Sequence, residues 1–335
     1  MQVIRGSVSE WSPLTRSVLS IGNFDGVHRG HRRIMRVAGA HSRRCDAPVV
    51  VMTFEPHPVT VLHPNDPVAT ITTSAEKLRL LEECAADYVY IADAAADLLA
   101  MTPEQFITTV VLSRFAPVCV VEGHNFGFGR GRTGDVDTLR NAGRDHGFDV
   151  VVVDPVMQVV GDQPQRVSSS LVRRLLLAGD VGVAAAALGR YYSIDAVVGR
   201  GAGRGVKLGF PTANLTRIDQ LIPADGVYAG WANLGGEHHP AAISVGSTPT
   251  FAAGVRQVEA HILDFEGDVY ERRIRIAFAH RLRPQQAFAS ADALREQISR
   301  DIDAVRAHAA GASSPGAQPS DIKLPDCQLP DCQLP

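Results

Sequence analysis

Residues 20–31 read Ser-Ile-Gly-Asn-Phe-Asp-Gly-Val-His-Arg-Gly-His, and this stretch decides the fold of the first part of the chain. The apolar run Val18 to Ile21 predicts a buried strand, and the glycines after it predict a turn into a helix. The start of a helix offers free N–H groups and a positive dipole end, which favour a phosphate group. We expect His28 and His31, with Gly30 between them, to share one helical face and to stabilise a phosphoryl group under attack. A His-x-x-His pair without this context is also compatible with two ordinary surface or core histidines.

The residues that follow alternate between apolar runs and helical patterns. Short buried strands are predicted at residues 18–21, 49–54, 88–91, 118–121 and 150–153. Helices are predicted at 73–85, capped by Ser74, and at 102–115, which starts with Thr102, Pro103 and Glu104. Strands separated by helices imply a parallel sheet with right-handed crossovers, and ligands bind at the carboxyl ends of its strands. The sequence therefore predicts a Rossmann-like α/β parallel-sheet domain with its site at the histidine turn.

Length and composition limit the class of protein. The 335 residues are 45% hydrophobic and 21% charged, which suits two domains that fold without disulfides. The net charge of −3 argues against general nucleic-acid binding. No basic-then-apolar leader and no membrane-spanning apolar stretch stands out. Five cysteines without a Cys-x-x-Cys pair suggest neither a disulfide framework nor a zinc site. We expect a cytoplasmic protein with small-molecule substrates and with neither nucleic-acid nor membrane partners; the oligomeric state is left open.

Three further segments of the first domain lie at or just after strand ends. Residues 53–58 contain two prolines and predict an extended, stiff exit from the strand. Residues 122–129 combine glycines with Phe126 and Phe128, which suits a loop against a flat ring or, alternatively, a loop whose aromatic side chains cap the core. Residues 166–173 open a helix, where hydroxyls and an arginine suit a triphosphate tail; the alternative is an ordinary serine cap.

The pattern changes after Gly189, which follows a short alanine-rich helix at 183–188. Strands are predicted at residues 194–198, 227–232, 241–245, 258–263 and 274–278, separated by turns as in an antiparallel barrel. A last helix at 291–308 carries an apolar face suited to the barrel wall, formed by Leu294, Ile298, Ile302 and Val305. We therefore expect an α/β domain at 1–187 and an antiparallel β-barrel with a C-terminal helix at 188–308.

Two neighbouring segments carry the predicted chemistry of the barrel domain. Residues 199–209 alternate glycines with cations, which suits a strip that reaches phosphates or, alternatively, a mobile linker. In the next segment, Phe-Pro-Thr-Ala-Asn-Leu at 210–215, Thr212 and Asn214 offer oxygen ligands on one side of an extended chain. Mg²⁺ prefers such ligands when it also holds nucleotide phosphates. The alternative is an edge strand that starts with a proline.

The motifs resemble known families in both halves of the chain. The string Gly-x-Phe-Asp-Gly-Val-His-x-Gly-His resembles the flavin adenylyltransferase branch of the His-x-Gly-His (HxGH) nucleotidyltransferases, and the segments 53–58, 122–129 and 166–173 match further motifs of that branch in order. Residues 208–215, Leu-Gly-Phe-Pro-Thr-Ala-Asn-Leu, resemble riboflavin kinase, as do 225–228, 244–251 and 258–265. The resemblance covers about residues 15–308. It identifies the chain as similar to the bacterial bifunctional riboflavin kinases and FAD synthetases (FMN adenylyltransferases).

This resemblance implies two ATP-dependent reactions. The barrel domain would form FMN from riboflavin, and the first domain would join FMN to AMP to give FAD and pyrophosphate. The implied catalytic residues are His28, His31 and Glu259; Glu259 would deprotonate the ribityl hydroxyl or, alternatively, is a charge on the solvent side of a strand. The implied ATP or phosphate ligands are Gly22, Phe24, Gly30, Ser168, Ser169, Ser170, Arg173, Gly203, Lys207 and Gly209. The implied flavin contacts are Asn125, Phe126 and Phe128, and the implied Mg²⁺ ligands are Thr212 and Asn214.

The chain departs from the family pattern at three positions. Gly127 stands where the family usually has arginine, Ser170 where it has threonine, and Glu271 where it has glycine. Two alternative functions follow: a riboflavin kinase whose adenylyltransferase domain has decayed, and a non-catalytic flavin-binding protein. The tail at 309–335 contains Cys327 and Cys332 among many small and proline residues, and we expect it to be disordered.

Overall fold

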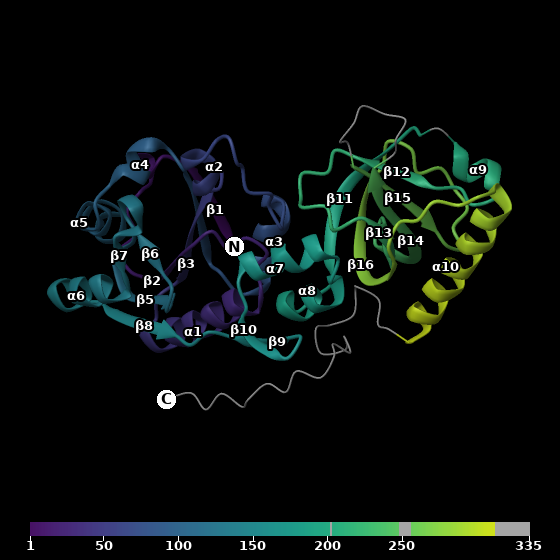
Figure 1. The fold of residues 1–335 in the computed structure, drawn as a ribbon. Coiled ribbons are helices and arrows are strands. Elements are labelled where there is room, and N and C mark those ends of the chain that lie inside the picture. Colours follow the sequence, from purple (N-terminus) through teal and green to yellow (C-terminus); the bar gives the residue numbers. More distant parts are fainter. Residues whose placement is uncertain (202, 248–255, 312–335) are drawn as a thin grey trace. The chain divides into compact units, whose positions relative to one another are not determined.

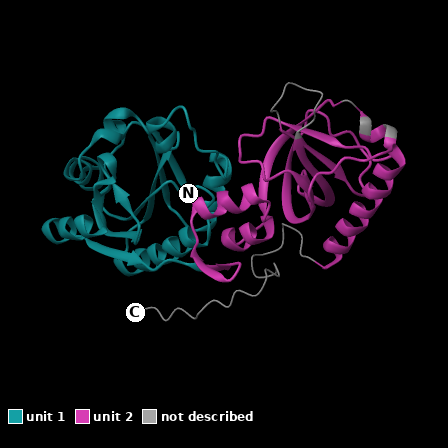
Figure 2. Ribbon diagram, in the orientation of Figure 1, with its two compact units in different colours: residues 1–157 teal, residues 158–335 magenta. Residues whose placement is uncertain are grey.

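The structure is a computed structural model that describes residues 1–201, 203–247 and 256–311. The chain divides into two compact units, residues 1–157 and 158–335 (Figure 2). This division falls before the predicted domain boundary at 187/188, because helix α8 (Val181–Leu188) packs on strands of the second unit. The predicted boundary stays a prediction, and the segment from residue 312 onward lies outside the described residues.

A six-stranded parallel sheet forms the centre of the first unit (Figure 1). Its spatial order is β1-β4-β3-β2-β5-β8. The strands are β1 (Gln2–Gly6), β2 (Ser17–Ile21), β3 (Val49–Glu55), β4 (Tyr88–Asp93), β5 (Pro117–Gly123) and β8 (Asp149–Val153). The five predicted strands and the parallel sheet are confirmed. Strand β1 was missed because it is a largely exposed edge strand without an apolar run.

Helices cover both faces of this sheet. On one face, α1 (Arg29–Cys45) and α3 (Ser74–Glu83) pack their apolar sides against β2, β3 and β4. The other face packs against α5 (Pro103–Phe106), the π-helix η2 (Ile107–Phe115) and α6 (Val136–His146). The short elements are η1 (Val8–Glu10), α2 (Pro58–Leu62), α4 (Ala96–Ala100), β6 (Gly127–Phe128), η3 (Arg130–Arg132), β7 (Gly134–Asp135), β9 (Met157–Val160) and β10 (Gln163–Arg166).

Two predicted helix details are wrong. The cap of α3 is Thr73 rather than Ser74, since the Thr73 hydroxyl accepts a hydrogen bond from the Glu76 amide at 3.2 Å. The single helix predicted at 102–115 is α5 followed by η2. In η2 the Ser113 hydroxyl donates to the Thr108 carbonyl five residues back, a spacing that the wider π turn accommodates.

A closed antiparallel barrel forms most of the second unit, in the order β11-β12-β15-β14-β13-β16. Its strands are β11 (Tyr192–Gly199), β12 (Ala213–Thr216), β13 (Gly226–Leu234), β14 (Glu237–Ser247), β15 (Arg256–Ile262) and β16 (Arg273–Arg283). The unit also contains α7 (Ser169–Ala178), α8, α9 (Arg204–Leu208) and α10 (Ala291–Gly311). The predicted barrel is confirmed, with the segment at Ala213 added as a sixth strand.

Helix α10 lies along the barrel, where it packs on β13 and β14 (Figure 1). Ile302 and Val305 are buried there, as their spacing predicted. Asp301 on the same helix is buried too, and its carboxylate accepts two-pronged hydrogen bonds of 2.8–3.2 Å from Arg283 of β16. Among the described residues, no helix combines the length and apolar character that crossing a membrane requires.

We predict that Asp301→Ala destabilises the second unit by about 3 kcal/mol, because it leaves the Arg283 guanidinium buried without its anion. Urea denaturation monitored by fluorescence measures this change. Asp303→Ala, an exposed position on the same helix, is the matched control and should stay within about 0.5 kcal/mol of the wild type. Equal effects of the two substitutions would contradict the role given to this ion pair.

Candidate active sites

The histidine turn leads from β2 to α1 in the first unit. His28 is the N-cap of α1, and its Nδ1 accepts a hydrogen bond from the His31 amide at 3.3 Å. The two imidazole rings stack with centroids 3.7 Å apart and planes 17° apart. His28 is buried, and Gly30 lies between the two histidines in the first helical turn. The structure therefore brings the two predicted histidines together at a helix N-terminus, where anions are favoured.

Burial controls the protonation of His31. It lowers the pKa of His31 well below its usual value of 6.5, and the nearby His28 lowers it further. His31 is therefore neutral at pH 7. Its Nδ1 is a buried polar atom without a hydrogen-bond partner among the described residues. A buried polar atom of this kind favours a ligand that supplies the missing hydrogen bond.

The turn has an unusual backbone that the core holds in place. Phe24 has φ 48° and Val27 has φ 35°, a left-handed conformation that is rare for side chains of this size. Both side chains are buried and pack in the core cluster with Met35 of α1. Their burial offsets the backbone strain, and this strain is typical of functional turns.

Asp25 fixes the turn to a distant loop. Its buried carboxylate accepts hydrogen bonds from the amides of Ile71 and Thr72 at 3.0–3.1 Å and from the Thr72 hydroxyl at 3.2 Å. The same hydroxyl accepts a hydrogen bond from the Gly26 amide at 3.1 Å. Sequence reasoning missed this role, because Asp25 and Ile71 are far apart in the chain and no local pattern marks the pair.

A buried lysine supports the turn from the side of β3. The Thr53 hydroxyl donates to the Asn23 carbonyl at 3.1 Å and accepts from the Lys77 amino group at 3.3 Å. Burial lowers the pKa of Lys77, although Glu55, 3.6 Å away, partly counters this effect. The Asn23 amide lies 3.0 Å from Nε2 of His57, which caps α2. The predicted stiff segment 53–58 therefore contacts the histidine turn.

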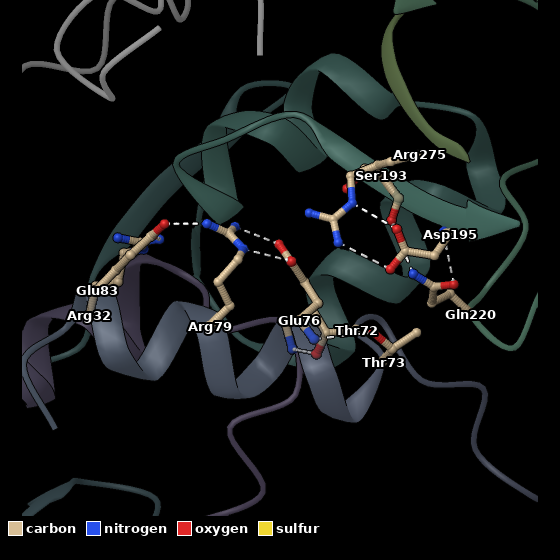
Figure 3. A network of polar contacts seen from close by, with 11 residues as sticks. Arg32, Thr72, Thr73, Glu76, Arg79, Glu83, Ser193, Asp195, Gln220 and Arg275 are labelled. Carbon is tan, nitrogen blue, oxygen red and sulfur yellow. Dashed lines mark hydrogen bonds and ion pairs between the residues drawn. The ribbon is translucent and has the colours of Figure 1, made fainter. Parts of the chain in front are cut away.

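Figure 3 shows ion pairs that hold the beginning of α1. Arg32, one residue after His31, contacts Glu83 of α3 at 3.2 Å, and Arg79 joins Glu83 to Glu76. The Arg32 side chain thus pairs with a carboxylate of its own unit.

In the second unit, the same view shows Arg275 of β16 paired with Asp195 of β11 at 2.7 Å.

The phenylalanine loop follows β5. The rings of Phe126 and Phe128 stack with centroids 5.3 Å apart, but Phe128 is buried in the core, while Phe126 is only partly buried. At Gly127 an added Cβ would come within 3.0 Å of the Arg132 guanidinium, and that guanidinium donates to the Asn125 carbonyl at 3.0 Å. Arg132 therefore places a cation over the position where the family usually has an arginine side chain.

The predicted phosphate segment at 166–173 begins α7 of the second unit. Ser168 is its N-cap, and the Ser168 hydroxyl accepts from the Leu171 amide at 3.2 Å. Ser169 and Arg173 are partly buried, and Ser170 is exposed. The serine-cap alternative thus holds for Ser168. The predicted phosphate-binding role of the segment remains a prediction.

The second predicted site lies on the outer face of the barrel. Asn214 of β12 pairs with Glu259 of β15, and the Thr212 hydroxyl donates to the Glu259 carboxylate at 3.5 Å. Val258 and Ala260 are buried, so Glu259 lies on the opposite side of the strand. Nδ1 of His261, on the same side, donates to the Pro211 carbonyl at 2.7 Å and thereby holds the segment before Thr212. The site therefore brings the Glu259 carboxylate together with the side-chain oxygens of Thr212 and Asn214.

Glycines near this site are required by close contacts. A Cβ at Gly201 would overlap the Asn214 amide at 2.1 Å, and one at Gly205 would come within 2.4 Å of the Phe210 carbonyl. The glycine strip therefore packs against the Thr212–Asn214 segment. Gly203 is the N-cap of α9, Lys207 lies in α9, and Gly209 follows it with φ 88°. Residues 248–251 of the segment 244–251 lie outside the described residues.

Glu271 stands where the family usually has glycine, and its backbone has a conformation that favours glycine. It has φ 59°, in the left-handed region where glycine is favoured, and its amide donates to the Val198 carbonyl at 2.9 Å. The turn between β15 and β16 thus keeps the backbone that a glycine would adopt.

Comparisons with known proteins match both units. The FAD synthetase family model matches residues 12–171, and the riboflavin kinase family model matches residues 188–309. A protein described as bifunctional riboflavin kinase/FMN adenylyltransferase from Escherichia coli K12 is 37% identical over 304 residues, covering 90% of this chain and 96% of that protein. A protein of the same description from Bacillus subtilis is 30% identical over 291 residues, covering 85% and 90%.

A solved structure is similar over most of the chain. It is described as a macrolide-efflux protein from Streptococcus pneumoniae, with 28% identity and a TM-score of 0.83. The similarity covers 92% of this chain and 100% of that chain. The two-unit fold therefore has a counterpart among solved structures.

We predict that Asp25→Ala loosens the histidine turn, because it removes the acceptor for two buried amides, each worth about 1–3 kcal/mol when left unpaired. Hydrogen exchange followed by mass spectrometry should show faster exchange at residues 22–28 and 71–72. Asp145→Ala, at an exposed position of α6, is the control and should leave these amides unchanged. Unchanged protection in Asp25→Ala would refute the role of this carboxylate.

Proposed function

The chain belongs to the family of bifunctional riboflavin kinases and FMN adenylyltransferases, and we propose how its two sites divide the work. The enzyme phosphorylates riboflavin with ATP to give FMN, and it joins FMN to AMP from ATP to give FAD and pyrophosphate. We assign adenylyl transfer to the histidine turn of the first unit and riboflavin phosphorylation to the barrel. The observation that carries this assignment is the stacked His28–His31 pair at the start of α1, far in the sequence from the Thr212–Glu259 pair.

In the proposed adenylyl transfer, a phosphate oxygen of FMN attacks the α-phosphorus of ATP, and the bond to the leaving pyrophosphate breaks. Charge develops on the α-phosphate oxygens during this step. His28 and His31 are the proposed donors that stabilise this charge, and the positive dipole end of α1 favours it as well. Gly22, Phe24 and Gly30 shape the turn. For Ser169, Ser170 and Arg173 of α7, the role as ligands of the outgoing phosphates stays a prediction from the sequence. Asn125 and Phe126 are the proposed flavin contacts, with Phe128 supporting them from the core.

In the proposed kinase reaction, Glu259 accepts the proton of the ribityl hydroxyl as the hydroxyl oxygen attacks the γ-phosphorus of ATP, and the bond from that phosphorus to the leaving ADP breaks. Thr212 and Asn214 are the proposed Mg²⁺ ligands. Their oxygen atoms fit this hard cation, and the missing Cβ of Gly201 leaves room at Asn214. When bound, Mg²⁺ would neutralise negative charge on the phosphates of ATP. Gly203, Lys207 and Gly209 belong to the segment proposed to lie along the phosphates.

The two alternative functions are disfavoured by particular contacts. A decayed adenylyltransferase domain has no need to keep strained Phe24 and Val27 in a buried turn or a cation at Arg132 over Gly127. A flavin-binding protein without turnover has no need of the Glu259 carboxylate beside Thr212. Both observations support two catalytic sites.

We predict that His28→Ala or His31→Ala lowers the rate of FAD formation by about 10²-fold or more, because each removes a donor to the transition state. FMN formation should stay within about twofold of the wild type, since the barrel is untouched. Chromatography of a reaction with riboflavin, ATP and Mg²⁺ then shows FMN accumulating. Parallel loss of FMN formation would sink the assignment of two separate sites.

We predict the opposite pattern for Glu259→Gln, which removes the proposed base. FMN formation should fall by about 10²–10⁴-fold. FAD formation from supplied FMN should remain at the wild-type rate. The same chromatographic assay, started once with riboflavin and once with FMN, measures both. Full kinase activity in this variant would rule out Glu259 as the base.

A further inference from the structure

Glu122 is a buried carboxyl group that the proposed mechanism does not use. It is 3% exposed on β5, and its Oε1 accepts a hydrogen bond from the Ile21 amide of β2 at 2.6 Å. The backbone pairing of these two strands extends only as far as Leu19 and Val120. The side chain of Glu122 therefore continues the connection where the backbone ladder between β2 and β5 stops.

The hydrogen bond between Ile21 and Glu122 lies where the strand order of the sheet reverses. The strand order reverses between β2 and β5, since the chain adds β3 and β4 on one side of β2 and then β5 and β8 on the other. Ligands of such sheets bind at the carboxyl ends of the strands at this point of reversal. Ile21 is the last residue of β2, and Gly22 begins the histidine turn.

The beginning of the turn is held from both sides. The Gly22 amide donates to the Met52 carbonyl of β3 at 3.0 Å, and the Ile21 amide donates to Glu122 of β5 at 2.6 Å. An apolar side chain at position 122 would leave the buried Ile21 amide without this acceptor. The carboxyl group therefore fixes the direction in which the chain leaves the sheet toward His28.

The surroundings of Glu122 favour its neutral form. Burial raises its pKa well above the usual value of 4.5, and the hydrogen bond from Ile21 counters this only in part. The elements over this face of the sheet contribute apolar side chains such as Phe106 and Leu139. The charged groups at the adjoining strand ends and loops have other partners: His124 pairs with Asp154, Asp25 binds Ile71 and Thr72, Arg132 binds the Asn125 carbonyl and Asp135 caps α6.

We propose that Glu122 is a positioning residue for adenylyl transfer, whose side chain holds the end of β2 and thereby the histidine donors. This inference rests on the proposed function of the first unit. It differs from a purely structural role, because a misplaced donor weakens transition-state stabilisation more than it weakens substrate binding.

The experiment compares Glu122→Val and Glu122→Gln in the full chain, with FMN and ATP supplied and kinase activity measured in the same samples. Glu122→Val should lower kcat for FAD formation by about 10-fold or more, with the KM values for FMN and ATP within about threefold. Glu122→Gln keeps the oxygen acceptor and should retain kcat within about threefold. Glu104→Gln, in the first turn of α5, is the matched surface control and should behave as the wild type.

The pH dependence of Tm tests whether the Glu122 carboxyl group is neutral in the folded protein. A carboxyl group with a raised pKa in the folded protein contributes stability below about pH 4.5 that is lost progressively as pH rises toward the folded pKa. Glutamine does not titrate, so the Tm of Glu122→Gln minus that of the wild type should rise by roughly 4 °C or more between pH 5 and pH 8. This readout needs only the conservative variant, which keeps the inference testable even where Glu122→Val fails to fold.

Each outcome decides one question. A wild-type chain that forms no FAD overturns the proposed function and this inference with it. An active wild type with unchanged kcat in Glu122→Val, or with equal loss of kinase and adenylyltransferase activity, overturns the inference alone. A Tm difference that does not change with pH overturns the neutral state of Glu122. A selective loss of kcat, rescued by glutamine, supports the proposal.

Discussion

The hydrogen bonds that Asp25 accepts from Ile71 and Thr72 are the constraint on which the first site depends. The helix start that presents His28 follows a backbone that Phe24 and Val27 adopt only under strain. Such a turn keeps its shape when the surrounding contacts over-determine it. Asp25 supplies those contacts to the loop at Ile71 and Thr72. Lys77 of α3 supports the turn through Thr53 of β3, and Glu122 supports it from β5. Each of these polar groups is buried and has a partner, so the turn is rigid before any substrate arrives.

The barrel site is held by a different constraint, the close approach of the glycine strip to the segment 210–214. The glycine strip packs so tightly on the Thr212–Asn214 segment that Gly201 and Gly205 leave no space for a Cβ. The pairing of β12 with β15 then places Asn214 beside Glu259. Ligand oxygens and the proposed base are thus fixed by strand register. Register is strongly specified here, because a slip by one residue would expose the buried Val258 and Ala260.

Particular residues show how far sequence reasoning reached. Alternating apolar runs predicted the central strands, and the motif at 20–31 predicted a helix start at the two histidines, where α1 begins. The sequence indicated a helix at 102–115 but not the change from α to π geometry, because this change depends on side-chain packing and a back-bonded hydroxyl. An edge strand at β12 was predicted only as the alternative to a Mg²⁺-binding segment, because four residues are too few to show a clear alternation of apolar and polar side chains. Glycine at position 127 suggested that the arginine usual in the family is missing, whereas the fold places the Arg132 guanidinium next to Gly127.

The sequence by itself determined the alternation of strands and helices in the first domain, the antiparallel strands of the second and the histidine pair. These depend on local spacing: two histidines three residues apart, a strand before a glycine turn, and an apolar face on the last helix. The resemblance of its motifs to the family supplied the proposed role of Glu259. Only the tertiary structure decided which groups hold the sites. Asp25 meets Ile71 across 46 positions, Thr212 meets Glu259 across 47, and Glu122 meets Ile21 across 101. Contacts over such separations form because the fold brings these polar groups together, and burial in the fold also raises the pKa of Glu122. Neither effect leaves a signature in the local sequence.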